Sequence, residues 1–157
     1  MQLMIAAVGR VRTPGLRDTI HAYERRASRY FRLKVVELPS ASLPDSAADR
    51  ARAIEETALL GAVPDELEIT ALTRQGELMD SRALAAYLEE MATYARPGAA
   101  FLLGGAHGLS AALLDRSRRR IALSRMTLPH EIARLVLVEQ LYRAGTILRG
   151  EPYHKGT

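Results

Sequence analysis

The feature that most constrains the fold is the run of residues 2–8, which is apolar after Gln2 and ends at Gly9. A strand in which polar and apolar residues do not alternate has to be buried on both faces, as strands in parallel sheets are. Residues 99–103 have the same character and end in Gly104-Gly105. Both segments therefore predict buried strands, each followed directly by glycine.

The rest of the chain alternates between strand and helix patterns. Gln75-Gly76 is typical of a turn, and Ser46, Ser81 and Ser110 are expected to cap helices. Strands that alternate with helices indicate an α/β fold with a largely parallel sheet, and a length of 157 residues fits one compact domain over residues 1–157. Strands are further predicted at residues 33–38, 67–72 and 121–123, and helices at 16–29, 46–60, 81–94, 110–119 and 129–148.

Composition narrows the class of protein. The chain has no cysteine, which excludes disulfides and thiolate metal sites, and none of its four histidines stands in a metal-ligand spacing. The apolar start has no basic leader and is too short for a signal peptide or a membrane span, so we expect a soluble, cytoplasmic protein with no membrane partner. A net charge of +4 permits an anionic partner such as nucleic acid but does not demonstrate one.

The segment 101–110, FLLGGAHGLS, is the sharpest local motif. A buried strand runs into three glycines within five residues, and a helix start follows. Glycine lets a ligand approach the backbone closely, and ligands of open α/β sheets bind beyond the carboxyl ends of strands. A tight turn without a ligand remains the alternative, because the motif is neither the dinucleotide fingerprint nor a P-loop.

Three further segments carry polar groups. Residues 121–131 lead from a strand through a polar loop into a helix, and they could face the same ligand or be an ordinary connection. The tail, residues 149–155, combines an aromatic ring, an imidazole and cations, although chain ends are often frayed. Arg116, Arg118, Arg119 and Arg120 could contact RNA phosphates or form a solvated helix end.

Taken in order, these motifs resemble the ribosomal large-subunit methyltransferase H family, which belongs to the SPOUT class. The resemblance covers essentially the whole chain, including the start and the segment around Leu72-Thr73. It is carried by LGGAHGLS at 103–110, LSRMTLPH at 123–130, LVLVEQLYRA at 135–144 and PYHK at 152–155.

The resemblance implies a specific activity. Members of this family methylate N3 of a pseudouridine in a hairpin loop of 23S ribosomal RNA, with S-adenosylmethionine as methyl donor, and prefer assembled ribosomes. They have an α/β fold with a C-terminal trefoil knot, and they work as homodimers with the active site near the subunit interface. The cofactor residues that the resemblance implies are Leu72, Thr73, Gly105, Ser124, Arg125, Met126, Thr127, Leu128 and Pro129.

The same resemblance implies that Tyr153, His154 and Lys155 lie near the target base. His154 is then the candidate general base, Tyr153 a stacking partner, and Lys155 a contact to a phosphate or to developing negative charge. The arginines of residues 116–120 would supply nonspecific RNA affinity. Two other functions stay open: a different nucleotide-binding α/β enzyme such as a dehydrogenase, and a noncatalytic RNA-binding module on the same fold.

Overall fold

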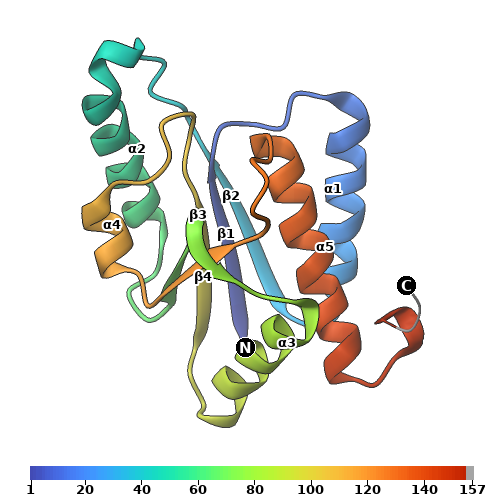
Figure 1. The fold of residues 1–157 in the computed structure, drawn as a ribbon. Helices are drawn as coiled ribbons and strands as arrows, with labels where there is room; N and C mark the ends of the chain where they lie inside the picture. The colour runs from blue at the N-terminus through green and yellow to red at the C-terminus, as the bar shows by residue number, and fades with distance from the viewer. Residues whose placement is uncertain (155–157) are drawn as a thin grey trace.

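The computed structural model describes residues 1–154 and contains a five-stranded parallel sheet (Figure 1). The strand order is β2-β1-β4-β3-β5, and every neighbouring pair runs parallel. This confirms the predicted α/β class. The strands are β1 (Gln2–Val8), β2 (Arg32–Leu38), β3 (Glu68–Leu78), β4 (Gly98–Leu103) and β5 (Arg119–Ala122).

Helices cover both faces of the sheet (Figure 1). On one face lie α1 (Pro14–Ala27), α3 (Ser81–Thr93) and α5 (His130–Leu148), and on the other lie α2 (Ala48–Ala62) and α4 (Ala111–Arg116). Two short 3-10 helices, η1 (Asp45–Ala47) and η2 (Pro152–His154), complete the described chain. No helix within residues 1–154 combines the length and the apolar character needed to cross a membrane.

The residues of β1 show why its sequence is apolar after Gln2. Leu3, Ile5 and Ala7 enter the core beneath α1, α3 and α5, whereas the residues between them enter the core beneath α2 and α4. Side chains of a strand point alternately to the two faces, so burial on both faces removes every polar position. The prediction from residues 2–8 is therefore confirmed.

Several predicted helix starts were wrong by a few residues. Helix α1 begins at Pro14 rather than at residue 16, because the fixed φ of proline suits a first helical position. Asp80, not Ser81, caps α3: its Oδ1 accepts a hydrogen bond from the Ala83 N–H at 2.7 Å. Ser46 lies inside η1 and does not cap α2.

The predicted turn at Gln75-Gly76 was also wrong. Strand β3 continues to Leu78 and pairs with β5 again after a shift in register between Leu72 and Glu77. A Cβ at Gly76 would lie 2.6 Å from the backbone carbonyl carbon of Ile121, so this glycine permits close approach of two strands. Similarly, the helix predicted to residue 119 ends at Arg116, and β5 begins two residues earlier than expected.

The connections diverge where β1 and β4 lie side by side. The chain leaves β1 for α1 on one face of the sheet and leaves β4 for α4 on the opposite face. Such a divergence opens a crevice at the carboxyl ends of the two strands, and this is where open α/β sheets bind ligands.

Candidate functional site

A cavity of about 1000 Å³ occupies this crevice. It is lined by the segments that follow β1, β4 and β5, by residues 72–75 of β3, and by the start of α5. All the predicted cofactor residues except Pro129 line it: Leu72, Thr73, Gly105, Ser124, Arg125, Met126, Thr127 and Leu128. Pro129 follows directly and is the N-cap residue of α5. The structure thus gathers residues from three separate segments of the sequence at one cavity.

The glycine loop after β4 forms a tight turn at the cavity wall. The Gly108 N–H donates to the Gly105 carbonyl at 3.0 Å. A Cβ at Gly104 would lie 2.7 Å from the Gly108 carbonyl oxygen, so a side chain there would force the turn open. The backbone can therefore face the cavity without side chains in the way.

Helix α2 holds this loop from behind. Arg52 donates from Nη1 to the His107 carbonyl at 3.3 Å, and the Glu56 carboxylate accepts from both the backbone N–H and the hydroxyl of Ser110. The Ser110 hydroxyl also accepts from the Leu113 N–H at 3.2 Å, which confirms it as the cap of α4. Glu55 is 4% exposed, and a Cβ at Gly105 would approach its Oε2 to 2.7 Å. These contacts fix the loop in one conformation.

The loop after β5 closes the cavity on the other side. The Ser124 hydroxyl accepts from the Met126 N–H at 2.9 Å, which shapes a local turn. Arg74 reaches across from β3 and donates to the Thr127 hydroxyl at 2.9 Å. Met126 remains 77% exposed at the rim. This hydrogen bond connects the part of β3 that contains Leu72 and Thr73 directly to the loop after β5.

A second group of cavity residues lies near the end of β1, and sequence reasoning had named only His130 of them, as part of the segment 121–131. His130 is the central member: its Nε2 is buried and has no hydrogen-bond partner within residues 1–154. Burial, and then the nearby Arg134 guanidinium, hold the pKa of His130 below its ordinary value. Gly9, with φ +92°, lies against this ring, since a Cβ there would be 3.7 Å from Cε1. The sequence signal that could have identified the rest of this group is β1, a second buried strand that is followed directly by glycine.

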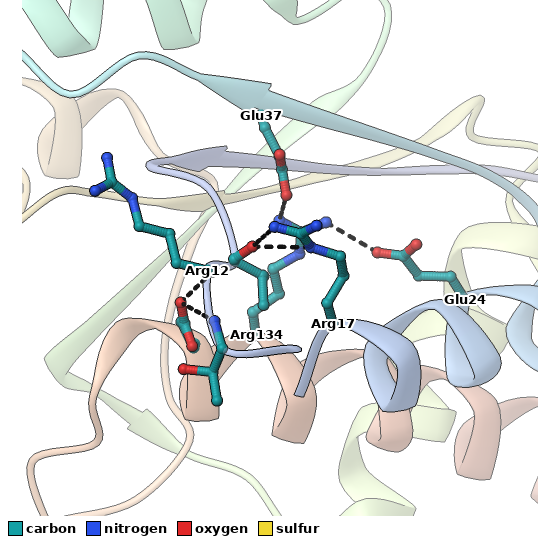
Figure 2. A network of polar contacts seen from close by, with 8 residues as sticks. Arg12, Arg17, Glu24, Glu37 and Arg134 are labelled. Carbon is teal, nitrogen blue, oxygen red and sulfur yellow. Dashed lines mark hydrogen bonds and ion pairs between the residues drawn. The ribbon is translucent and has the colours of Figure 1, made fainter. Parts of the chain in front are cut away.

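A buried ion-pair network stabilises the start of α5 (Figure 2). Arg134 is 2% exposed and pairs through Nη1 with Glu37 of β2 and through Nη2 with Glu24 of α1, the latter at 3.0 Å. Glu131 Oε1 accepts from the Arg12 N–H at 2.5 Å, and this backbone hydrogen bond lowers the pKa of its carboxyl. The network joins α5, α1, β2 and the loop after β1, so it fixes the position of His130.

Comparison with known proteins identifies the family. A family model described as "Predicted SPOUT methyltransferase" matches residues 1–154. The chain belongs to the SPOUT methyltransferase family. Proteins named ribosomal RNA large subunit methyltransferase H from Gemmatimonas aurantiaca and Listeria monocytogenes are 44% and 40% identical to it, each over 99% of this chain and 100% of the relative.

Solved structures agree on the fold of this SPOUT methyltransferase. A probable methylase family protein from Haemophilus influenzae aligns with a TM-score of 0.58 at 15% identity, over 98% of this chain and 70% of the other. A probable methyltransferase from Bordetella pertussis aligns with a TM-score of 0.53 at 19% identity, over 92% and 93% of the two chains. At such identities the likeness shows the fold alone. The trefoil knot stays a prediction.

Within residues 149–153 of the tail, no side chain of this SPOUT methyltransferase lines the cavity of its own chain. Tyr153 folds back on the middle of α5, where its hydroxyl donates to Glu139 Oε1 at 3.1 Å and its ring centroid lies 4.5 Å from that of Tyr142. Glu139 lies nine residues along α5 from His130, about 13 Å at the usual helical rise. His154 ends η2 but its side chain lies outside the description, and Lys155 lies outside the described residues.

The predicted RNA-contacting arginines lie around the start of β5, away from its carboxyl end. Arg119 pairs with Glu77 at 3.3 Å and lies 4.5 Å from the centre of the Tyr87 ring. Arg120 pairs with Asp115 at 2.7 Å. Arg116 and Arg118 are exposed. At least half of this cluster is therefore engaged within the protein.

Proposed function

We propose that this SPOUT methyltransferase transfers a methyl group from S-adenosylmethionine to N3 of a pseudouridine in a hairpin loop of 23S ribosomal RNA. The observation that carries the proposal is the cavity itself, which gathers nearly the whole predicted cofactor set from three distant segments. The names of the relatives support ribosomal RNA as the substrate.

The cavity fits the proposed cofactor in the part between the glycine loop and the loop after β5. Gly104 and Gly105 bring bare backbone to the wall, where any Cβ would meet the Gly108 carbonyl or the Glu55 carboxylate. Backbone groups of residues 124–128 and 72–73 would hold the adenosine and methionine portions. The bound cofactor would supply an electrophilic methyl group with its leaving group already in place.

The protein's own contribution is then mainly to position the reactants. Bringing two reactants together in the correct geometry replaces a bimolecular encounter, and this can account for several kcal/mol of the barrier. Exposed Arg74 and Arg125 line the cavity mouth, where they would contact RNA phosphates together with Arg116 and Arg118. We keep Tyr153, His154 and Lys155 as substrate contacts, with His154 as candidate base.

The position of the tail favours a homodimer. Tyr153 lies along α5, away from the cavity of its own chain, so in this position it would contact a target base only at the cavity of a second copy. Light scattering at micromolar concentration should give twice the mass of the chain. A monomeric mass, with methyl transfer intact, would remove the dimer and the tail assignment together.

The activity is tested by methyl transfer to ribosomes. Assembled ribosomes whose 23S RNA lacks the modification are incubated with the protein and methyl-labelled S-adenosylmethionine, and the RNA is digested and analysed by mass spectrometry. We expect one 3-methylpseudouridine per large subunit, and none when the target is uridine. Cofactor binding without transfer would instead support an RNA-binding module, and stabilisation by NAD but not by S-adenosylmethionine a different enzyme.

A further inference from the structure

The cavity mouth is bordered by exposed arginines on two sides. Arg74 on β3 and Arg125 in the loop after β5 line it on one side. On the other side, the loop after β1 contains Arg10 and Arg12, both exposed, and begins at Gly9, which lines the cavity. Strands β4 and β3 separate β1 from β5, so the two sides are about 14 Å apart at the usual strand spacing. The proposed function assigns a role to the first pair of arginines but none to the second.

The positive charges of Arg10 and Arg12 are not neutralised by any carboxylate within residues 1–154. The carboxylates of this region interact with other groups. Glu37 pairs with Arg134, and Glu131 accepts from the backbone N–H of Arg12 rather than from its guanidinium. Figure 2 shows this guanidinium pointing away from the ion pairs of Arg134. Both cations therefore remain available to an anionic ligand.

The backbone of the loop after β1 is fixed by hydrogen bonds. At its start, the Gly9 N–H donates to the Leu38 carbonyl at 2.8 Å. In its middle, the Arg17 guanidinium donates from Nη2 to the Val11 carbonyl at 2.9 Å. The two exposed arginines are thus carried by a backbone that is already ordered, so less conformational entropy is lost when they bind a ligand.

Position distinguishes these two arginines from other exposed cations of the protein. Arg29 and Arg32 are also exposed and have no carboxylate partner within the described chain, but they lie at the amino end of β2, at the opposite end of the sheet from the cavity. Exposure alone therefore does not identify a binding site. Only the loop after β1 combines unpaired cations with a place at the cavity mouth, opposite Arg74 and Arg125.

We infer that the RNA strand carrying the target nucleotide crosses the cavity mouth from the loop after β5 to the loop after β1, and that Arg10 and Arg12 bind its backbone phosphates on the β1 side. This inference rests on the proposed function. Enzymes that modify a base take it out of its stack and into a pocket. A nucleotide is joined to each of its neighbours through a phosphate, so a base inside the cavity places backbone on both sides of the mouth. Cations on one side would hold only half of that backbone.

A binding experiment tests the surface without any turnover. A fluorescently labelled RNA hairpin with pseudouridine in its loop is titrated with protein saturated with S-adenosylhomocysteine, at a series of salt concentrations, and anisotropy gives the affinity. We expect the double variant Arg10→Gln/Arg12→Gln to bind at least about tenfold more weakly. The slope of log affinity against log salt should become shallower by about 1.4, since each phosphate contact to a single strand contributes about 0.7. An unchanged slope would overturn the inference.

The matched control is Arg29→Gln/Arg32→Gln, which removes the same charge at the other end of the sheet and should keep nearly the wild-type slope. Equal losses in the two double variants would show that only net charge matters, and this would overturn the inference. Arg10→Lys/Arg12→Lys retains both charges and should recover most of the affinity, because lysine also binds phosphate as a point charge.

Kinetics with assembled ribosomes provide the second test. We expect Arg10→Gln/Arg12→Gln to raise the KM for ribosomes about tenfold, with kcat and S-adenosylmethionine affinity within about threefold of the wild type, since contacts to flanking phosphates are made equally in the ground and transition states. A lowered kcat with an unchanged KM would overturn the inference. So would a smaller mass of the variant in light scattering, which would assign the loop to the contact between two copies.

Failure of the inference and failure of the proposed function are distinguishable. If the wild type transfers methyl groups and the variant keeps its salt slope, the inference alone falls. If the wild type transfers no methyl group to ribosomes, the proposed function fails, and the comparison of the two double variants in RNA binding still decides whether the loop after β1 contacts RNA.

Discussion

The two ends of α5 carry similar residue types but use them differently. At the amino end, Arg134 and its carboxylate partners form a buried network beside a histidine whose Nε2 has no partner in the described chain. Beyond the carboxyl end the chain folds back, so that Tyr153 donates to Glu139 in the middle of α5 and Tyr30 donates to Glu151. Among the described residues, a buried polar group without a partner thus lies at the amino end of α5, whereas the two tyrosines and two carboxylates beyond its carboxyl end pair with one another.

The pKa values of the tyrosines agree with this contrast. The hydrogen bond to Glu151 raises the pKa of Tyr30 to about 12, and burial together with hydrogen bonds to Tyr23 and Glu139 raises that of Tyr153. Both phenols therefore stay protonated at any physiological pH. In this conformation Tyr153 acts as a donor to the protein itself, and a role at the target base would require it to leave Glu139.

The largest expected difference between the two ends is in stability. Arg134→Ala should lower the free energy of unfolding by about 3 kcal/mol, because two partly buried carboxylates lose their cation. The matched change at the other end, Arg143→Ala, removes a more exposed pair with Glu139 and should cost about 1 kcal/mol. Urea denaturation of both variants measures the difference, and equal losses would contradict the contrast.

Substitutions at two glycines distinguish an effect on stability from an effect on cofactor binding. Gly104→Ala places a Cβ 2.7 Å from the Gly108 carbonyl oxygen, and Gly145→Ala places one 2.4 Å from Cγ of the Tyr30 ring. Each should destabilise the protein by about 1–3 kcal/mol. Only Gly104→Ala should also weaken S-adenosylmethionine binding, by at least about tenfold in calorimetry, because it opens the glycine turn. Comparable loss of affinity in Gly145→Ala would show that binding simply follows stability.

Removal of the Tyr153 hydroxyl tests the tail end alone. Tyr153→Phe loses the hydrogen bond to Glu139 and the contact with the Tyr23 hydroxyl, so unfolding should cost about 1 kcal/mol less. Cofactor affinity should not change, because the residue does not line the cavity of its chain. Tyr94→Phe is the control, since Tyr94 is exposed. A loss of cofactor affinity in the Tyr153 variant would place the tail nearer to the cavity than the structure does.

Sequence reasoning identified the elements that a local pattern of residues determines. The apolar runs identified β1 and β4, because a strand that is buried on both faces has a continuous apolar sequence without alternating polar residues. It failed at Gly76, whose role depends on the approach of Ile121 from another strand. It included His130 in the polar segment 121–131 but gave it no role of its own, since no local pattern tells whether its Nε2 finds a partner. The cofactor residues were named by resemblance, and the structure supplied their common location.

The smallest expected effect is the pH dependence that His130 gives to stability. Its pKa is lowered in the folded protein, so near pH 6 the unfolded chain binds more of a proton than the folded one. Stability from this group should therefore be complete above the ordinary histidine pKa of about 6.5 and should decline as pH falls toward the lowered value. In His130→Asn the slope of unfolding free energy against pH between 7 and 5 should be shallower than in the wild type. His21→Asn, which changes an exposed side chain of α1, is the matched control for substitution of a histidine. If both variants changed the slope equally, His130 would not differ from an exposed histidine in its effect on stability. The contrast between the two ends of α5 would then rest on the ion pairs alone.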